Sequence, residues 1–125
     1  MHEERPHVLV VDDEPNQLVT ISRILSRQGL EVHTADNGAQ ALEILRRESI
    51  DVMITDLNMP IMDGMEFLTA LRAEDRQKQP IVVMCTTEND MPRIVQAMQA
   101  GANEYIMKPF DSEIIQTKFS QIGLI

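Results

Sequence analysis

Val52-Met53-Ile54-Thr55-Asp56 is a short apolar run that ends at a carboxylate, and the chain then turns through Leu57-Asn58-Met59-Pro60. The run predicts a strand at Asp51–Asp56 that opens into a loop. Open α/β sheets place their ligand sites at the carboxyl ends of strands. Asp56 is therefore the first candidate for a functional side chain.

Three other apolar runs end in the same manner, at polar or charged residues. They are His7–Val11 before Asp12 and Asp13, Ile81–Cys85 before Thr86, and Glu104–Met107 before Lys108. If these strands gather in one sheet, their ends bring three aspartates, a hydroxyl and a lysine together. Such a set can bind a divalent cation and a phosphoryl group at once.

Segments with a helical spacing of apolar residues alternate with the strands. The expected helices run from about Pro15 to Gln28, from Gly38 to about Glu48, from Gly64 through Leu71, from Pro92 to Ala100, and from Asp111 or Ser112 almost to Ile125. A further short strand is expected at Glu31–Ala35. Five strand–helix units predict an all-parallel sheet with helices on both faces, which is a doubly wound α/β fold.

Length and composition exclude several classes of protein. The chain has 125 residues, enough for one domain over 1–125, and the last helix leaves no room for an output domain. Its 11 basic and 20 acidic residues give a formal charge of −9, which argues against direct binding to nucleic acid. Cys85 is the only cysteine, so an internal disulfide is excluded and a cytoplasmic location is expected. The polar N-terminus is no signal peptide, and no apolar run approaches the roughly 18 residues that membrane insertion needs.

The acidic residues at the strand ends indicate a particular chemistry. Asp12, Asp13 and Asp56 would repel one another at close range, and a divalent cation removes that repulsion. Mg²⁺ is the expected cofactor because it commonly binds carboxylates together with phosphate. Asp56 is either a metal ligand only or a nucleophile that forms an aspartyl phosphate, with Lys108 and Thr86 stabilising the phosphoryl oxygens. The plainer alternative for the Asp12-Asp13 pair is two solvated acids at a strand end.

Other reactive residue types are expected to be structural. His2, His7 and His33 show no spacing typical of metal ligands, so the sequence predicts no metal site from them. Cys85 lies on a strand that should be buried, with no histidine near it in the pattern, and is expected to pack and not to react.

Six segments in a fixed order carry a family resemblance. They are Val11–Glu14, Asp56–Pro60, Met62–Gly64, Thr86, Ala100–Tyr105 and Lys108–Phe110. With these segments the chain resembles, over almost its whole length, the receiver domain of bacterial two-component response regulators, most of all the single-domain chemotaxis regulators of the CheY type. The resemblance implies a flavodoxin-like (βα)5 fold with strand order 2-1-3-4-5. It also implies a switch that is not an enzyme, apart from self-phosphorylation from a phosphodonor and autodephosphorylation.

The resemblance further implies a role for each matched residue of the site. Asp56 would accept a phosphoryl group from a sensor histidine kinase, here the chemotaxis kinase, and Lys108 would pair with that group. Asp13 and Asp56 would bind Mg²⁺ through their side chains, Asn58 through its backbone carbonyl, and Asp12 mainly through water.

A route from the site to a partner is implied in the same way. Thr86 would move towards the phosphoryl group on activation, and Tyr105 would then turn inward. The output surface would comprise the fourth helix, the fifth strand and the fifth helix, including Ile94, Tyr105 and Lys118. Its partner would be the flagellar motor switch protein, and a phosphatase is left open as a further partner.

Two matched positions concern the loss of the phosphoryl group. Asn58 and Glu88 would orient an attacking water and so promote rapid autodephosphorylation. Thr87 has the opposite implication, because a residue of its size would narrow access to the phosphoryl group.

Three alternatives stay beside this interpretation. The chain could be a phosphorelay intermediate or a phosphate sink with no effector, or a receiver domain from a longer DNA-binding regulator. A hydrolase of the haloacid dehalogenase type is disfavoured because Asp56 is followed by Leu57-Asn58, without the second acid of that family's motif.

Overall fold

Five strands and five helices alternate along the residues that this computed structural model describes, which are 5–56, 64–74, 79–86, 91–108 and 111–123. The strands are β1 (His7–Val11), β2 (Glu31–Ala35), β3 (Val52–Asp56), β4 (Ile81–Thr86) and β5 (Glu104–Met107). The helices are α1 (Pro15–Arg27), α2 (Gly38–Arg47), α3 (Gly64–Ala73), α4 (Met91–Gln99) and α5 (Ser112–Gln121). Each predicted element is present, and its predicted ends coincide with the observed ones or differ by one or two residues, except that α5 ends at Gln121 and not close to Ile125.

All of the strand pairs are parallel, and the sheet order is β2-β1-β3-β4-β5. The predicted fold class and strand order are therefore confirmed. The chain leaves β1 for β2 on one side and returns to β3 on the other, so the strand order reverses between β1 and β3. A reversal of this kind opens a crevice at the carboxyl ends of the two strands.

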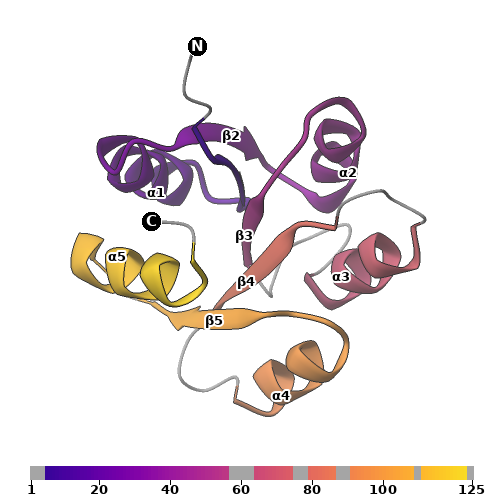
Figure 1. The fold of residues 1–125 in the computed structure, drawn as a ribbon. Coiled ribbons are helices and arrows are strands. Elements are labelled where there is room, and N and C mark those ends of the chain that lie inside the picture. Colours follow the sequence, from indigo (N-terminus) through magenta and orange to yellow (C-terminus); the bar gives the residue numbers. More distant parts are fainter. Residues whose placement is uncertain (1–4, 57–63, 75–78, 87–90, 109–110, 124–125) are drawn as a thin grey trace.

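Helices cover both faces of the sheet, with α1 and α5 on one side and α2, α3 and α4 on the other (Figure 1). Alternate residues of β1 enter the two cores. Val8 and Val10 pack with α1 and α5, whereas Leu9 and Val11 pack with the opposite helices. All four are at most 1% exposed. Continuous apolar runs are typical of parallel strands because both of their faces are buried.

Local capping determines where several helices begin and end. Glu14, Asn37 and Asp111 each accept a hydrogen bond from a backbone N–H in the first turn of α1, α2 and α5, at 2.8, 2.8 and 3.0 Å. Of the two predicted caps for α5, Asp111 is the one used. Gly29 follows α1 with a φ of 85°, a left-handed conformation that glycine adopts at little cost.

The side chain of Arg72 joins α3 to two segments that are distant in sequence. Its Nη2 donates to the carbonyl oxygen of Gly101 at 2.7 Å and to Oδ1 of Asn103 at 2.9 Å. Its Nη1 donates to the carbonyl oxygen of Pro80 at 2.9 Å. Asn103 Oδ1 also accepts from the backbone N–H of Val82 at 2.8 Å. Burial lowers the pKa of Arg72, and these hydrogen bonds offset the desolvation of its charge.

None of the helices among the described residues combines the length and the apolar composition needed to cross a membrane.

Replacing Arg72 with alanine should therefore be costly. We expect Arg72→Ala to lower the free energy of unfolding by about 2–3 kcal/mol, because several acceptors, most of them in partly buried hydrogen bonds, lose a charged donor. The matched control is Arg46→Ala. Arg46 forms an ion pair with Glu74 at 3.3 Å with 63% of its side chain exposed, and its loss should cost less than about 1 kcal/mol. Urea denaturation measures both, and equal losses would contradict the structural role of Arg72.

Candidate functional site

The carboxyl ends of β1 and β3 bring the predicted acidic residues together. The register pairs Val11 with Thr55, so the next residues along the two strands, Asp12 and Asp56, lie level with each other. One carboxylate oxygen from each of Asp12, Asp13 and Asp56 lies within 4.8 Å of the other two. Asp12 is buried, Asp56 is half-buried and Asp13 is exposed. Oxygen ligands at this spacing can hold a hard divalent cation at the edge of the sheet, where Asp13 is exposed to solvent.

Lys108 reaches this acidic cluster from β5. Its Nζ lies 2.8 Å from Oδ2 of Asp56 and 3.3 Å from Oδ2 of Asp12. Its backbone N–H donates to the carbonyl oxygen of Thr86 at 2.7 Å, which joins the ends of β5 and β4. Thr86 is the last residue of β4, one residue beyond the predicted strand, and is 1% exposed. The structure thus gathers Asp12, Asp13, Asp56, Thr86 and Lys108 at one edge of the sheet, as predicted.

Electrostatic repulsion and burial both affect the protonation of the site. Burial raises the pKa of Asp12, and the charge of Asp56 raises it further. The backbone N–H of Glu14 and the ammonium of Lys108 lower this pKa in part. For Lys108, burial alone would lower the pKa, but the hydrogen bond and charge of Asp56 outweigh it, so that the pKa is raised. Three carboxylates thus face one ammonium group, which leaves the site able to take up a cation.

Cys85 precedes Thr86 and lies opposite Asp56 in the register, but it is 1% exposed. Burial raises the pKa of its thiol to about 12. A thiol that stays protonated is a poor nucleophile, which agrees with the predicted packing role.

The residues predicted for the output surface differ in their exposure to solvent. Tyr105 is half-buried, and Nζ of Lys118 lies 5.2 Å from the centre of its ring and 3.2 Å from Oε1 of Glu104. The placement of Ile94 on this surface is wrong, since its side chain is 2% exposed. Ile94 and Ala97 are three residues apart on α4 and both face the sheet.

The exposed apolar side chains of α4 are different ones. Met91, Val95 and Met98 are 40%, 52% and 38% exposed. Their spacing of four and three residues places them along one strip of the helix, beside Ile94, which is three residues from Met91 and four from Met98. Because Ile94 shares this helical spacing, periodicity alone does not separate the buried side chain from the exposed ones, and the packing of α4 on the sheet decides between them.

Some residues that the sequence analysis assigned to the site or its surroundings lie outside the part of the chain that the structure describes. They are Asn58, Thr87, Glu88 and Pro109.

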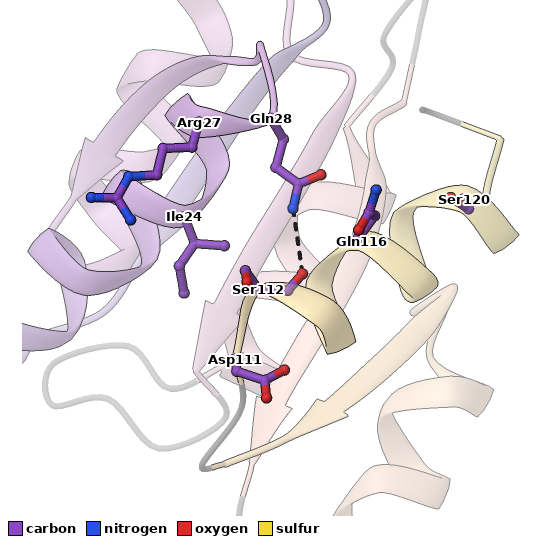
Figure 2. Close-up of a pocket in the computed structure, with 7 residues that line it drawn as sticks. All are labelled: Ile24, Arg27, Gln28, Asp111, Ser112, Gln116 and Ser120. Atoms are coloured by element: carbon purple, nitrogen blue, oxygen red, sulfur yellow. Dashed lines mark hydrogen bonds between the residues drawn. The ribbon is translucent and has the colours of Figure 1, made fainter.

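A cavity of about 780 Å³ lies between α1 and α5, and Figure 2 shows the residues that line it. Nε2 of Gln28 donates across it to the backbone carbonyl of Ser112 at 3.3 Å. The one carboxylate in its lining belongs to Asp111, which already caps α5. The lining includes none of the clustered aspartates, so we assign the chemistry to the strand ends and not to this cavity.

Asp12→Asn should stabilise the protein in the absence of metal. The folded pKa of Asp12 is above the unfolded value of 3.8, so stability is lost progressively as the pH rises from 3.8 through the folded pKa. Asparagine retains the acceptor for the backbone N–H of Glu14 and removes the charge, and we expect the free energy of unfolding at pH 7 to rise. The gain should shrink as the pH falls towards 3.8.

Urea denaturation with a chelator present tests this expectation across the pH range. The control Glu43→Gln removes an exposed charge on α2 and should leave stability nearly unchanged. A variant that is less stable than the parent at pH 7 would contradict the electrostatic account.

Comparison with known proteins supports one family. The model of the response regulator receiver domain matches residues 8–120. The chemotaxis protein CheY of Pseudomonas aeruginosa is 37% identical over 116 residues, which are 92% of this chain and 94% of that protein. The transcriptional regulatory protein PrrA of Mycobacterium tuberculosis is 40% identical over 105 residues, 84% of this chain and 44% of that protein. The structure of chemotaxis protein CheY4 of Vibrio cholerae matches with a TM-score of 0.89 and 33% identity, over 95% of this chain and 99% of the other. Together with the acidic cluster and Lys108 at the strand ends, these matches show that the chain belongs to the response regulator receiver family.

Proposed function

We propose that this protein is a phosphorylation-activated switch of chemotaxis, in which Asp56 accepts a phosphoryl group from a sensor histidine kinase. The observation that carries the proposal is the position of Lys108, whose Nζ lies 2.8 Å from Oδ2 of Asp56 beside two further carboxylates. A lysine this close to the acceptor is already in place for the oxygens of an incoming phosphoryl group.

Phosphoryl transfer to Asp56 forms one bond and breaks another. A carboxylate oxygen of Asp56 bonds to phosphorus as the bond from phosphorus to the kinase's imidazole nitrogen breaks. Asp12, Asp13 and Asp56 would hold Mg²⁺, with Asn58 as the further ligand that the family resemblance implies. Mg²⁺ neutralises charge on the phosphoryl oxygens. The ammonium of Lys108 exchanges part of its pairing with Asp56 for a phosphoryl oxygen. The nitrogen released from phosphorus keeps the electron pair, and the ring leaves as neutral imidazole because its other nitrogen carries a proton.

The change at Asp56 has a short route to the output surface. Thr86 ends β4, and its carbonyl oxygen is bound to the backbone N–H of Lys108 at 2.7 Å. Movement of Thr86 towards the phosphoryl group would therefore also act on the carboxyl end of β5, the strand that carries Tyr105. The two states need differ by only a few kcal/mol for phosphorylation to select one of them.

The output surface in this proposal is formed by α4, β5 and α5. It includes Tyr105 and Lys118, and it includes Met91, Val95 and Met98 of α4 in place of Ile94. The partner is the flagellar motor switch protein, and the protein acts in the cytoplasm as a regulator that only phosphorylates and dephosphorylates itself. The CheY relatives support the chemotaxis role.

Two alternatives have specific support. The similarity to PrrA, which covers 44% of that regulator, fits a receiver that works within a longer transcriptional regulator. A phosphate sink or phosphorelay intermediate needs the same site and no output surface. Binding measurements on the phosphorylated protein separate both from a motor regulator.

Phosphorylation itself is tested with acetyl phosphate and Mg²⁺. The intact mass of the parent should increase by one phosphoryl group, and Asp56→Asn should abolish the increase because the nucleophilic oxygen is lost. Asp111→Asn, which alters a carboxylate outside the acidic cluster, is the control and should be labelled like the parent. Labelling that persists in Asp56→Asn would exclude Asp56 as the acceptor.

Binding to a peptide of the flagellar motor switch tests the output surface. We expect the phosphorylated parent to bind more tightly, and Val95→Asp to reduce that affinity by at least about tenfold through loss of an apolar contact. Val19→Asp is the matched control, because Val19 is 50% exposed on α1 and Val95 is 52% exposed on α4. A parent whose binding does not respond to phosphorylation would favour the phosphate sink.

A further inference from the structure

A second group of metal-ligand side chains lies away from the acidic cluster, towards the amino end of the sheet. His7 is the first residue of β1, His33 lies in the middle of β2, and Glu48 is the C-cap residue of α2. One potential ligand atom from each of the three lies within 4.8 Å of the other two. Three separate elements therefore converge on one position.

The sheet register explains why the two histidines meet. Parallel pairing aligns His7 with Glu31 and Leu9 with His33. Since alternate residues of a strand point to the same face, His7 and His33 project on the face that carries Leu9. That face is covered by α2 (Figure 1), and Glu48 ends α2 near the two rings.

The two imidazoles already direct nitrogen atoms at each other. Nδ1 of His7 lies 2.9 Å from Nε2 of His33, the ring centres are 5.2 Å apart, and the ring planes differ by 19°. The backbone N–H of His7 donates to Oδ2 of Asp51 at 2.8 Å, which fixes this end of β1. Both rings are half-buried, and Glu48 is exposed, so solvent reaches the group from one side.

We propose that His7, His33 and Glu48 form a binding site for Zn²⁺. Two imidazoles and one carboxylate are a ligand set that Zn²⁺ accepts, with water in the fourth position. Tetrahedral bonds of about 2.0–2.1 Å separate two ligand nitrogens by roughly 3.3 Å. Binding therefore replaces the hydrogen bond of 2.9 Å between the rings, which move slightly apart and turn both lone pairs to the ion. His7 must carry its proton on Nε2 to present Nδ1 to the ion.

The two groups of side chains should bind different metal ions because their ligand atoms differ. Imidazole ligands favour zinc, copper and nickel, whereas sites made of carboxylates and water favour magnesium and calcium. Zn²⁺ at His7 and His33 would tie the edge strand β2 to β1 and to the end of α2. It would thus stabilise the folded chain without occupying the position beside Asp56.

Titration calorimetry with ZnCl₂ on the full chain, in excess Mg²⁺ to occupy the acidic cluster, tests the proposal. We expect one equivalent of Zn²⁺ to bind and the midpoint of thermal unfolding to rise. His33→Gln should weaken binding by more than the roughly 10- to 100-fold that loss of an outer-shell partner causes, and Glu48→Gln should also weaken it. Asp13→Asn, which alters only the acidic cluster, should bind Zn²⁺ like the parent.

A further variant tests whether Zn²⁺ binds to His2 near the N-terminus and not to the proposed site. His2→Gln should leave binding unchanged, and loss of binding in His2→Gln with retention in His33→Gln would overturn the proposal. Absence of stoichiometric binding by the parent would overturn it as well. If circular dichroism shows that His33→Gln is unfolded, Glu48→Gln decides, because an exposed carboxylate can be replaced without disturbing the core.

Discussion

The parallel pairing of β1 with β3 is the constraint on which the rest of the site depends. Both strands are buried on both faces, so a slip of one residue would exchange the side chains of the two cores. Burying a side chain such as Val10 or Ile54 contributes roughly 1.5–3 kcal/mol, and many such terms fix the register. The level placement of Asp12 and Asp56 is thus maintained by apolar packing beneath them, even though the acidic residues repel one another.

This arrangement makes the site responsive to charge. Asp12 is kept largely out of water beside Asp56, and Lys108 balances only part of the negative charge. Any group that changes the charge at Asp56 changes the pairing of Lys108. Because the backbone N–H of Lys108 donates to the carbonyl oxygen of Thr86, such a change would, in the switch that we propose, also act on the ends of β4 and β5. A local electrostatic event can therefore alter a surface formed by neighbouring elements.

The same sheet gives its two ends different chemistry. At the carboxyl ends, hard oxygen ligands and a lysine suit Mg²⁺ and phosphate. Towards the amino end, His7 and His33 offer imidazole nitrogens on neighbouring strands. Arg72 adds a polar connection between α3 and the segments that flank β4 and β5.

The sequence by itself determined the order and type of the elements, the strand-end positions of Asp12, Asp56, Thr86 and Lys108, and the family, because these depend on local patterns and spacing. Tertiary structure decided which side chains meet across strands and which face of a helix is covered. The burial of Ile94 and the exposure of Val95 follow from how α4 lies on the sheet. The approach of His7 to His33, separated by 26 residues, depends on a register that no local spacing records. Contacts of that kind are set by the packing of the whole core, and so they become visible only when the chain is folded.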